Sequence, residues 1–211
     1  MLYWFAKILF TPFFWLIFRP KLTGRKHLKS EGKAIYVCNH FSLADPVALA
    51  ALCPRTIHFM AKESLFDNIL LKLLLTSLFV FPAGEGGGSR LGPVKRALAL
   101  LKEEKAFGIF PEGHRSASIL EMDELERGAA FIAQRSGAKV IPIYIDPMCW
   151  RRMRIRGAVG EPIDPADFAN AKGVKPVEAM TRYLASAFDG LREETLAMVS
   201  ERELKKGLKK A

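Results

Sequence analysis

The feature that most constrains the fold is the alternation of short apolar runs with longer helical stretches along most of the chain. Runs rich in β-branched and aromatic residues predict strands at residues 34–38, 56–61, 106–110 and 139–145, with a basic edge strand at 151–158. Apolar residues at helical spacing predict helices at residues 45–52, 65–79, 93–102, 124–136 and from 177 onward. This alternation indicates an α/β fold with a mixed, largely parallel sheet flanked by helices.

The chain length suits a single domain with shorter segments at its two ends. With 211 residues it can bury a sizeable core. We expect an N-terminal membrane-associated helical anchor at residues 1–20, the α/β domain at 21–170, and a C-terminal helical segment with a basic tail at 171–211.

The N-terminal segment is unusually aromatic. Its first eighteen residues include Tyr3, Trp4, Phe5, Phe10, Phe13, Phe14, Trp15 and Phe18. Aromatic rings favour the bilayer interface, and the run is shorter than the ~20 apolar residues of a spanning helix. Lys7 and Pro12 also interrupt it. We therefore expect a kinked hairpin or helix that dips into one leaflet. The alternative is a core helix of a soluble protein.

Two further segments bear on the expected membrane contact: the basic residues after the aromatic segment and the apolar stretch at residues 65–79. Arg19, Lys21, Arg25 and Lys26 follow the aromatic segment, as on a cytoplasmic flank that faces anionic headgroups. The predicted helix at 65–79 belongs either to the core or to a second membrane-contacting face. We expect a peripheral or monotopic protein at the cytoplasmic face of the cell membrane.

The net charge limits the classes of binding partner, and the cysteine content bears on the redox environment and on metal binding. A net charge of +10 favours an anionic partner, which is a nucleic acid, an anionic lipid surface or a phosphorylated substrate. The chain has no RNP, zinc or helix-turn-helix signature, so we expect no nucleic-acid partner. Its three cysteines lack metal-ligand spacing, which is typical of a reduced, cytosol-facing protein without a metal site.

A histidine and an aspartate frame the first polar loop. His40 follows the predicted strand at 34–38, and Asp45 begins the next predicted helix. Five residues of separation let the carboxylate hydrogen-bond one ring nitrogen, which leaves the other free to take a proton from an alcohol. The alternative is that Asp45 only caps the helix and that His40 packs.

The second polar loop, Phe110 to Ser116, follows another apolar strand. Gly113 lets the backbone approach a ligand closely, and the planar fork of Arg115 matches a phosphate. By itself this is a generic anion-binding loop.

Together the two loops resemble the glycerolipid acyltransferases, a family that includes bacterial 1-acylglycerol-3-phosphate acyltransferases. The first family motif, NHxxxxD, matches residues 39–45, and the third, FPEGTRS, matches FPEGHRS at 110–116. Further blocks match in order at residues 81–90, 140–143 and 160–163. Two departures are His114, where the family usually has Thr, and Glu85, where it usually has Arg.

The resemblance implies transfer of a fatty acyl group from acyl-CoA or acyl-carrier protein to the sn-2 hydroxyl of 1-acyl-sn-glycerol-3-phosphate, giving phosphatidic acid. His40, oriented by Asp45, would be the base, and backbone N–H groups near the helix N-terminus would stabilise the oxyanion. No cofactor or metal is implied. Substrate binding is expected from Asn39, Arg90, Glu112, Gly113 and Arg115. Further candidate contacts are Lys62, His114 and Ser116.

The two departures leave the acceptor headgroup open, although Arg90 follows Glu85 closely enough to supply the missing charge. One alternative is an acyltransferase for another lysolipid, such as a lyso-ornithine lipid or lysophosphatidylethanolamine. A second alternative is a non-catalytic membrane-binding protein. The expected partners are the lysophospholipid, the acyl thioester or its carrier protein, and an anionic membrane surface.

Overall fold

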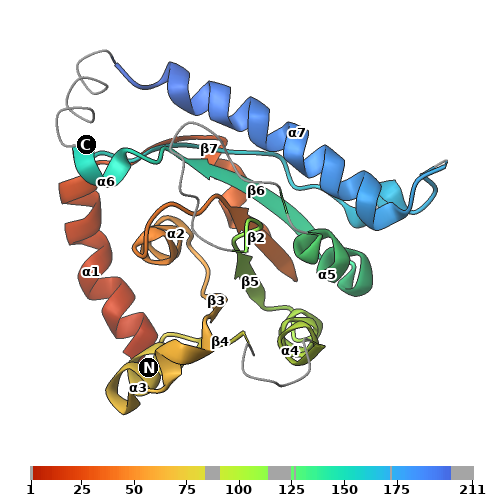
Figure 1. Cartoon of the computed structure of the whole chain (residues 1–211). Coiled ribbons are helices and arrows are strands. Elements are labelled where there is room, and N and C mark those ends of the chain that lie inside the picture. Colours follow the sequence, from red (N-terminus) through yellow and green to blue (C-terminus); the bar gives the residue numbers. More distant parts are fainter. Residues whose placement is uncertain (1, 84–90, 114–124, 126, 172, 201–211) are drawn as a thin grey trace.

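A computed structural model describes residues 2–83, 91–113, 125, 127–171 and 173–200. Within these residues a seven-stranded mixed sheet has the order β1-β7-β6-β2-β5-β3-β4 (Figure 1). The strands are β1 Lys21–Thr23, β2 Ala34–Cys38, β3 Ile57–Ala61, β4 Val80–Pro82, β5 Ala106–Ile109, β6 Lys139–Ile145 and β7 Arg156–Val159. The helices are α1 Leu2–Phe18, α2 Asp45–Leu52, α3 Ile69–Ser77, α4 Leu91–Lys102, α5 Gly128–Ser136, α6 Cys149–Arg152 and α7 Pro176–Ala197. Short 3₁₀ helices are η1 Arg25–Lys29, η2 Glu63–Phe66 and η3 Pro165–Phe168.

Strand direction brings several loops to one edge of the sheet. Strands β2 to β6 run parallel to one another, whereas β1 and β7 run the opposite way. Strand β2 is central and pairs with β6 on one side and β5 on the other. The segments that follow β2, β3, β4, β5 and β6 therefore all leave the same edge, where α/β folds bind ligands.

Both faces of the sheet are covered, and β2 shows why its sequence is apolar throughout. Ile35 and Val37 point into a core shared with α4, α5 and α7. The alternate residues Ala34, Tyr36 and Cys38 point into a second core shared with α1 and α2. A strand buried on both faces has no polar positions, which is the pattern of the predicted run.

Helix α7 completes the first core, on the face of the sheet opposite α1 and α2 (Figure 1). It buries Met180, Leu184, Phe188 and Leu191, which lie three or four residues apart on one side of the helix. The predicted C-terminal helix is thus part of the α/β core.

The predicted α/β fold class is confirmed, and the strands β2 and β6 and the helix α2 have their predicted bounds. One strand was missed and three local predictions were wrong. Residues 80–82, for which no strand was predicted, form an edge strand; Pro82, which has no N–H to donate, suits an edge. The predicted edge strand at 151–158 instead contains the end of α6 and most of β7, which lies inside the sheet because β1 covers it.

The other two errors concern helix starts. The predicted helix at 65–79 divides into η2 and α3, because the Asn68 side chain accepts hydrogen bonds from the N–H groups of Leu70 and Leu71 and begins a new helix. The helix expected from residue 124 begins at Gly128.

The aromatic N-terminal segment forms one helix, α1, that continues through Pro12, so of the two expected forms, a kinked hairpin or a helix, it adopts the helix. It is tied to the domain by Lys7, whose Nζ donates to the carbonyls of Cys53 (2.7 Å) and Arg55 (2.8 Å) just beyond α2. Tyr3 and Phe14 are buried against the domain. No helix in the described part of the chain combines the length and apolar character needed to cross a membrane.

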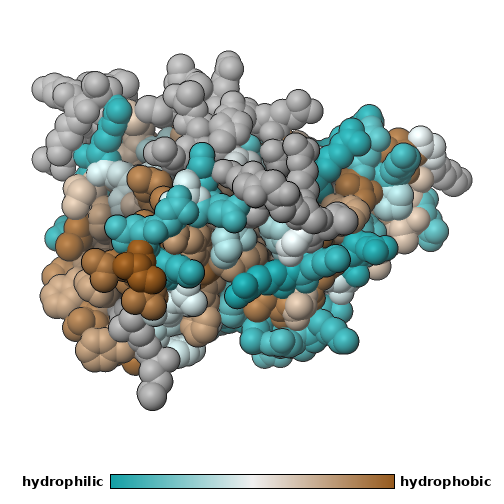
Figure 2. Space-filling view, turned by 60° about the horizontal axis from the view of Figure 1, so that its bottom comes forward, coloured by the Kyte–Doolittle hydropathy of each residue, from teal (hydrophilic) through white to brown (hydrophobic). Residues whose placement is uncertain are grey.

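The outer sides of α1 and α3 expose large apolar side chains. We call them the α1–α3 apolar face: Trp4, Phe5, Ile8, Leu9, Phe10, Phe13, Leu16 and Ile17 from α1, and Ile69, Leu70, Leu73 and Leu74 from α3. Figure 2 shows hydrophobic surface gathered on the side of the molecule where Figure 1 places these helices. None of the α3 residues is buried, so this helix is not a core element. The ring of Tyr3 in α1 contacts the ring of Phe79, two residues beyond α3, with their centroids 5.3 Å apart.

Candidate active site

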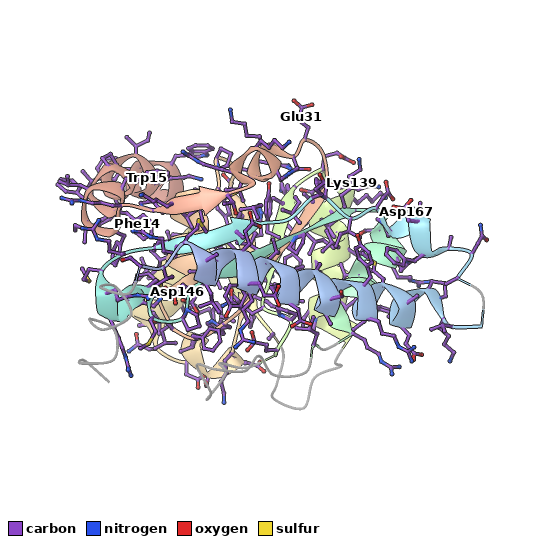
Figure 3. All side chains as sticks on the ribbon, turned by 90° about the horizontal axis from the view of Figure 1, so that it is seen from above. Phe14, Trp15, Glu31, Lys139, Asp146 and Asp167 are labelled. Atoms are coloured by element: carbon purple, nitrogen blue, oxygen red, sulfur yellow. The ribbon has the colours of Figure 1, made fainter. Side chains whose placement is uncertain are left out.

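The predicted site residues gather where the parallel strands end. His40 follows β2 and Glu112 follows β5, and Trp150, which was not predicted as a site residue, lies in α6 after β6. In the view from above, Asp146 at the end of β6 lies on the same side as Phe14 and Trp15 of α1, away from Lys139 at the start of the strand (Figure 3). The C-terminal half of α1 therefore lies on the side toward which β6 runs.

His40 and Asp45 form a hydrogen-bonded pair. The distance from His40 Nδ1 to Asp45 Oδ2 is 3.1 Å, and the side chains are 16% and 6% exposed. Among the described residues, no hydrogen-bond partner contacts the other ring nitrogen, His40 Nε2. With the proton placed on Nδ1 by the carboxylate, Nε2 is the nitrogen that can accept a proton from a substrate hydroxyl.

Asp45 also closes its own loop. Its Oδ2 accepts hydrogen bonds from the backbone N–H groups of Phe41 (2.6 Å) and Ser42 (2.7 Å). Its Oδ1 accepts from Trp150 Nε1 at 2.8 Å. The residue that precedes α2 is Ala44, and α2 has no side-chain cap. The alternative in which Asp45 only caps the helix is therefore wrong, because the carboxylate faces back toward His40.

Several backbone N–H groups at the start of α2 already have hydrogen-bond partners within the loop. The N–H groups of Phe41 and Ser42 donate to Asp45, and that of Ala44 donates to Ser42 Oγ at 3.2 Å. The Asp45 N–H donates to the Ser42 carbonyl, and Pro46 has none. These four bonds hold the loop in place, and the stabilisation of an oxyanion by backbone N–H groups near the helix N-terminus stays a prediction.

An aromatic stack supports the imidazole. The rings of His40 and Phe110 lie 4.2 Å apart with an interplanar angle of 24°, and Phe110 stacks in turn on Phe59 at 6.2 Å. Gly108 makes room for this arrangement, since a Cβ there would lie 2.4 Å from the Phe59 ring. Phe110 was recognised as part of a motif, but its stacking on His40 has no local signal in the sequence.

Glu112 connects the two predicted loops. Its side chain is 1% exposed, and its Oε1 accepts a hydrogen bond from the His40 backbone N–H at 3.0 Å. Burial raises the pKa of neighbouring Tyr144 to about 12; Arg192 of α7 lowers it through charge and a hydrogen bond, and Glu112 raises it. The buried carboxylate thus sits close to a tyrosine–arginine pair that sequence reasoning did not identify.

Asn39 has a different role from the predicted one. Its Nδ2 donates to the Ile145 carbonyl at 2.7 Å, and its Oδ1 accepts from the Ile145 N–H at 2.8 Å. The side chain is buried, and both ends of its amide are bound to the end of β6. We correct the substrate-binding prediction for Asn39, because its side chain connects the loop after β2 to the end of β6 by two hydrogen bonds.

Of the remaining residues predicted to contact substrate, the structure describes Gly113 and Lys62. Gly113 follows Glu112 with a φ of +70°, a conformation that favours glycine. Lys62 is exposed directly after β3. Four predicted residues lie outside the described residues: Arg90, His114, Arg115 and Ser116. Glu85 also lies outside them.

The cysteines are unsuited to nucleophilic chemistry. Cys38, Cys53 and Cys149 are free and buried. Burial is the largest cause that raises the pKa of each thiol, and the charge of Asp45 raises it further for Cys38 and Cys149. A thiolate is the reactive form, so these side chains act as packing groups. The described residues contain no cluster of His, Cys, Asp and Glu side chains that could hold a metal ion.

Comparison with known proteins identifies relatives. A family model described as Acyltransferase matches residues 19–146. The 1-acyl-sn-glycerol-3-phosphate acyltransferase of Bacillus subtilis (strain 168) is 32% identical over 172 residues, which cover 78% of this chain and 83% of that protein. A protein of the same name from Cocos nucifera is 25% identical over 146 residues, covering 67% of this chain and 47% of its own.

A solved structure has a similar fold. The 1-acyl-sn-glycerophosphate (LPA) acyltransferase PlsC from Thermotoga maritima superposes with a TM-score of 0.67 at 21% sequence identity. The match covers 89% of this chain and 80% of that one. At this identity the likeness concerns the arrangement of the helices and strands.

Proposed function

This chain belongs to the acyltransferase family, and from that premise we propose that it acylates the sn-2 hydroxyl of 1-acyl-sn-glycerol-3-phosphate to give phosphatidic acid. The observation that carries the proposal is the His40–Asp45 pair at the carboxyl end of the central strand. The names of the relatives support the acceptor. The donor is an acyl thioester, either acyl-CoA or acyl-carrier protein.

In this mechanism His40 acts as a general base. Nε2 takes the proton from the acceptor hydroxyl while Asp45 stabilises the resulting imidazolium through Nδ1. The hydroxyl oxygen attacks the thioester carbonyl and forms a tetrahedral intermediate. Its collapse breaks the C–S bond, and the leaving thiolate takes the proton from the imidazolium. Base catalysis of this kind contributes ~10²–10⁴-fold to a rate.

The acceptor phosphate requires cationic side chains near this centre. We assign that role to Arg90 and Arg115, because guanidinium groups bind phosphate oxygens in pairs. Further candidates are Lys62, which follows β3, and His114, which directly precedes Arg115 in the sequence. The net charge of +10 supports an anionic acceptor, an anionic donor and an anionic membrane surface.

The α1–α3 apolar face suits a protein that rests on the cytoplasmic leaflet of the cell membrane. Its aromatic and aliphatic side chains are exposed, and an exposed group of large apolar side chains is typical of an interaction surface. Leu43, between His40 and Asp45, and Val47, on α2, are also strongly exposed. A lysolipid held in the leaflet would then present its hydroxyl close to His40.

An acceptor competition experiment tests the reaction. Purified protein receives radiolabelled acyl-CoA or acyl-carrier protein together with equal amounts of 1-acylglycerol-3-phosphate and lysophosphatidylethanolamine in mixed vesicles. We expect labelled phosphatidic acid as the main product from at least one donor. Label in the other phospholipid alone would contradict the proposed acceptor and support a different lysolipid. Absence of any labelled lipid with either donor would contradict the reaction.

A further inference from the structure

An indole N–H contacts the catalytic carboxylate from a distant part of the chain. Trp150 Nε1 donates to Asp45 Oδ1 at 2.8 Å, although the two residues are 105 positions apart. Trp150 lies in α6, the short helix that follows β6, and its side chain is half-buried against the core formed with α1 and α2. Neither of the two family motifs contains this residue.

The hydrogen bond completes the support of Asp45. His40, Phe41 and Ser42 all contact Oδ2, whereas Trp150 is the sole hydrogen-bond donor to Oδ1 among the described residues. The outer torsion of an aspartate is soft, so contacts to one oxygen leave the carboxylate plane free to rotate. A donor on the second oxygen fixes that plane, and with it the direction in which Oδ2 faces the imidazole.

Helix α1 in turn supports the indole. The Phe18 ring contacts Trp150 edge-on, with centroids 5.1 Å apart at an angle of 78°, and Phe14 packs on Phe18 at 4.9 Å. This geometry is favourable for aromatic pairs. The last turns of α1 therefore hold the tryptophan that holds Asp45.

We propose that Trp150 is a positioning residue of the acyl transfer: its indole N–H fixes the Asp45 carboxylate so that His40 Nε2 is aimed at the acceptor hydroxyl. The assignment rests on the proposed function, because it describes the same proton transfer. A residue that acts only through Asp45 affects the chemical step and leaves lipid binding unchanged.

The first test replaces Trp150 with phenylalanine, which keeps an aromatic ring beside Phe18 and removes the donor. We expect kcat to fall about 10-fold or more with KM for both substrates unchanged, because hydrogen bonds to charged groups are among the stronger ones. The matched control is Trp15→Phe, since Trp15 lies on α1 and packs against Arg25 instead of Asp45. A Trp150→Phe enzyme with the kcat of wild type overturns the proposal.

A double-mutant cycle separates positioning from general damage. In an Asp45→Ala background, Trp150→Phe should change the remaining rate less than twofold, because the group through which it acts is gone. An equal loss in both backgrounds means that the tryptophan serves only the fold, and that result overturns the proposal.

A spectroscopic measurement tests the contact without catalysis. The chain has three tryptophans, so ¹⁵N-labelled protein gives three indole N–H signals, and the one lost in Trp150→Phe belongs to Trp150. Asp45→Ala should move this signal and speed its exchange with water. If wild type acylates no lysolipid, the proposed function fails and this signal still decides the contact: an indole that does not respond to Asp45→Ala overturns the proposal.

Discussion

Asp45 uses one oxygen for His40 and for the backbone of its own loop, and the other for Trp150. The spacing of His40 and Asp45 predicted their pairing, because both residues lie in the short segment between β2 and the start of α2. The contact with Trp150 was not predictable in this way, since residues 105 positions apart meet only after the sheet has formed. The same limit explains Asn39, for which the resemblance to the family implied a substrate contact, while its partner, Ile145, lies at the end of another strand.

Asn39→Ala tests the corrected role of this residue. We expect the free energy of unfolding to fall by roughly 1–3 kcal/mol, because the Ile145 N–H and carbonyl lose their buried partners. KM for the acceptor should stay within about twofold of wild type, since the side chain is not proposed to touch substrate. Urea unfolding and steady-state kinetics measure the two effects. Wild-type stability with a strongly raised KM would restore the substrate-binding interpretation.

His58 gives the fold a predicted sensitivity to acid. Burial lowers its pKa below 6.5 and Lys105 and Arg96 add to this, whereas the hydrogen bond to the Ala106 carbonyl and the charge of Glu103 raise it. The unfolded chain then binds more protons as the pH falls below 6.5, so stability decreases from there down to the folded-state pKa and is unaffected above it.

The check is urea unfolding of wild type and His58→Gln at about pH 7.5 and about pH 5.5, on either side of the ordinary histidine pKa. Glutamine keeps a donor for the Ala106 carbonyl but does not titrate. The wild type should lose more stability than the variant between the two values. Equal losses would show that His58 is not responsible.

The elements differ in how far their own residues, without their neighbours in the fold, determine their structure. Strands β2 and β6 were predicted with their bounds because both are buried on two faces and read as continuous apolar runs. Strand β4 has only three residues and takes its form from pairing with β3. The residues expected to form one edge strand at 151–158 instead supply the end of α6 and most of β7, because β1 pairs with β7 and places it inside the sheet. Such short elements depend on neighbours that a sequence pattern does not show.

The α1–α3 apolar face yields a prediction about membrane binding. A double variant, Leu70→Ser with Leu73→Ser, should weaken binding to anionic vesicles about 10-fold or more, because burial of a leucine contributes about 1.5–3 kcal/mol. The free energy of unfolding should stay within ~0.5 kcal/mol, since both side chains are at least 60% exposed.

The matched control for the vesicle experiment is Tyr183→Ser, another exposed large side chain, which lies on α7. It should leave vesicle binding unchanged in a flotation assay. If the leucine variant binds as wild type does, α3 does not contact lipid.

The whole molecule brings the loops after five parallel strands to one edge, beside a helix whose outer side is apolar. The sequence predicted this architecture because the alternation of elements is a property of the entire chain. The sequence also indicated that the aromatic N-terminal segment is a separate element. The contacts that connect α1 to Asp45, from Phe18 to Trp150 and from Trp150 to Asp45, form only in the tertiary structure.

The role of His40 as the general base is tested most directly by the rate of phosphatidic acid formation in wild type, His40→Ala and Asp45→Ala, with His27→Ala as a control histidine in η1. Labelled acyl thioester and 1-acyl-sn-glycerol-3-phosphate are supplied in vesicles. We predict product from wild type and His27→Ala at similar rates, and a loss of kcat of at least ~10²-fold for His40→Ala, the lower end of general-base catalysis. A His40→Ala enzyme within tenfold of wild type would contradict the assignment of His40 as the base.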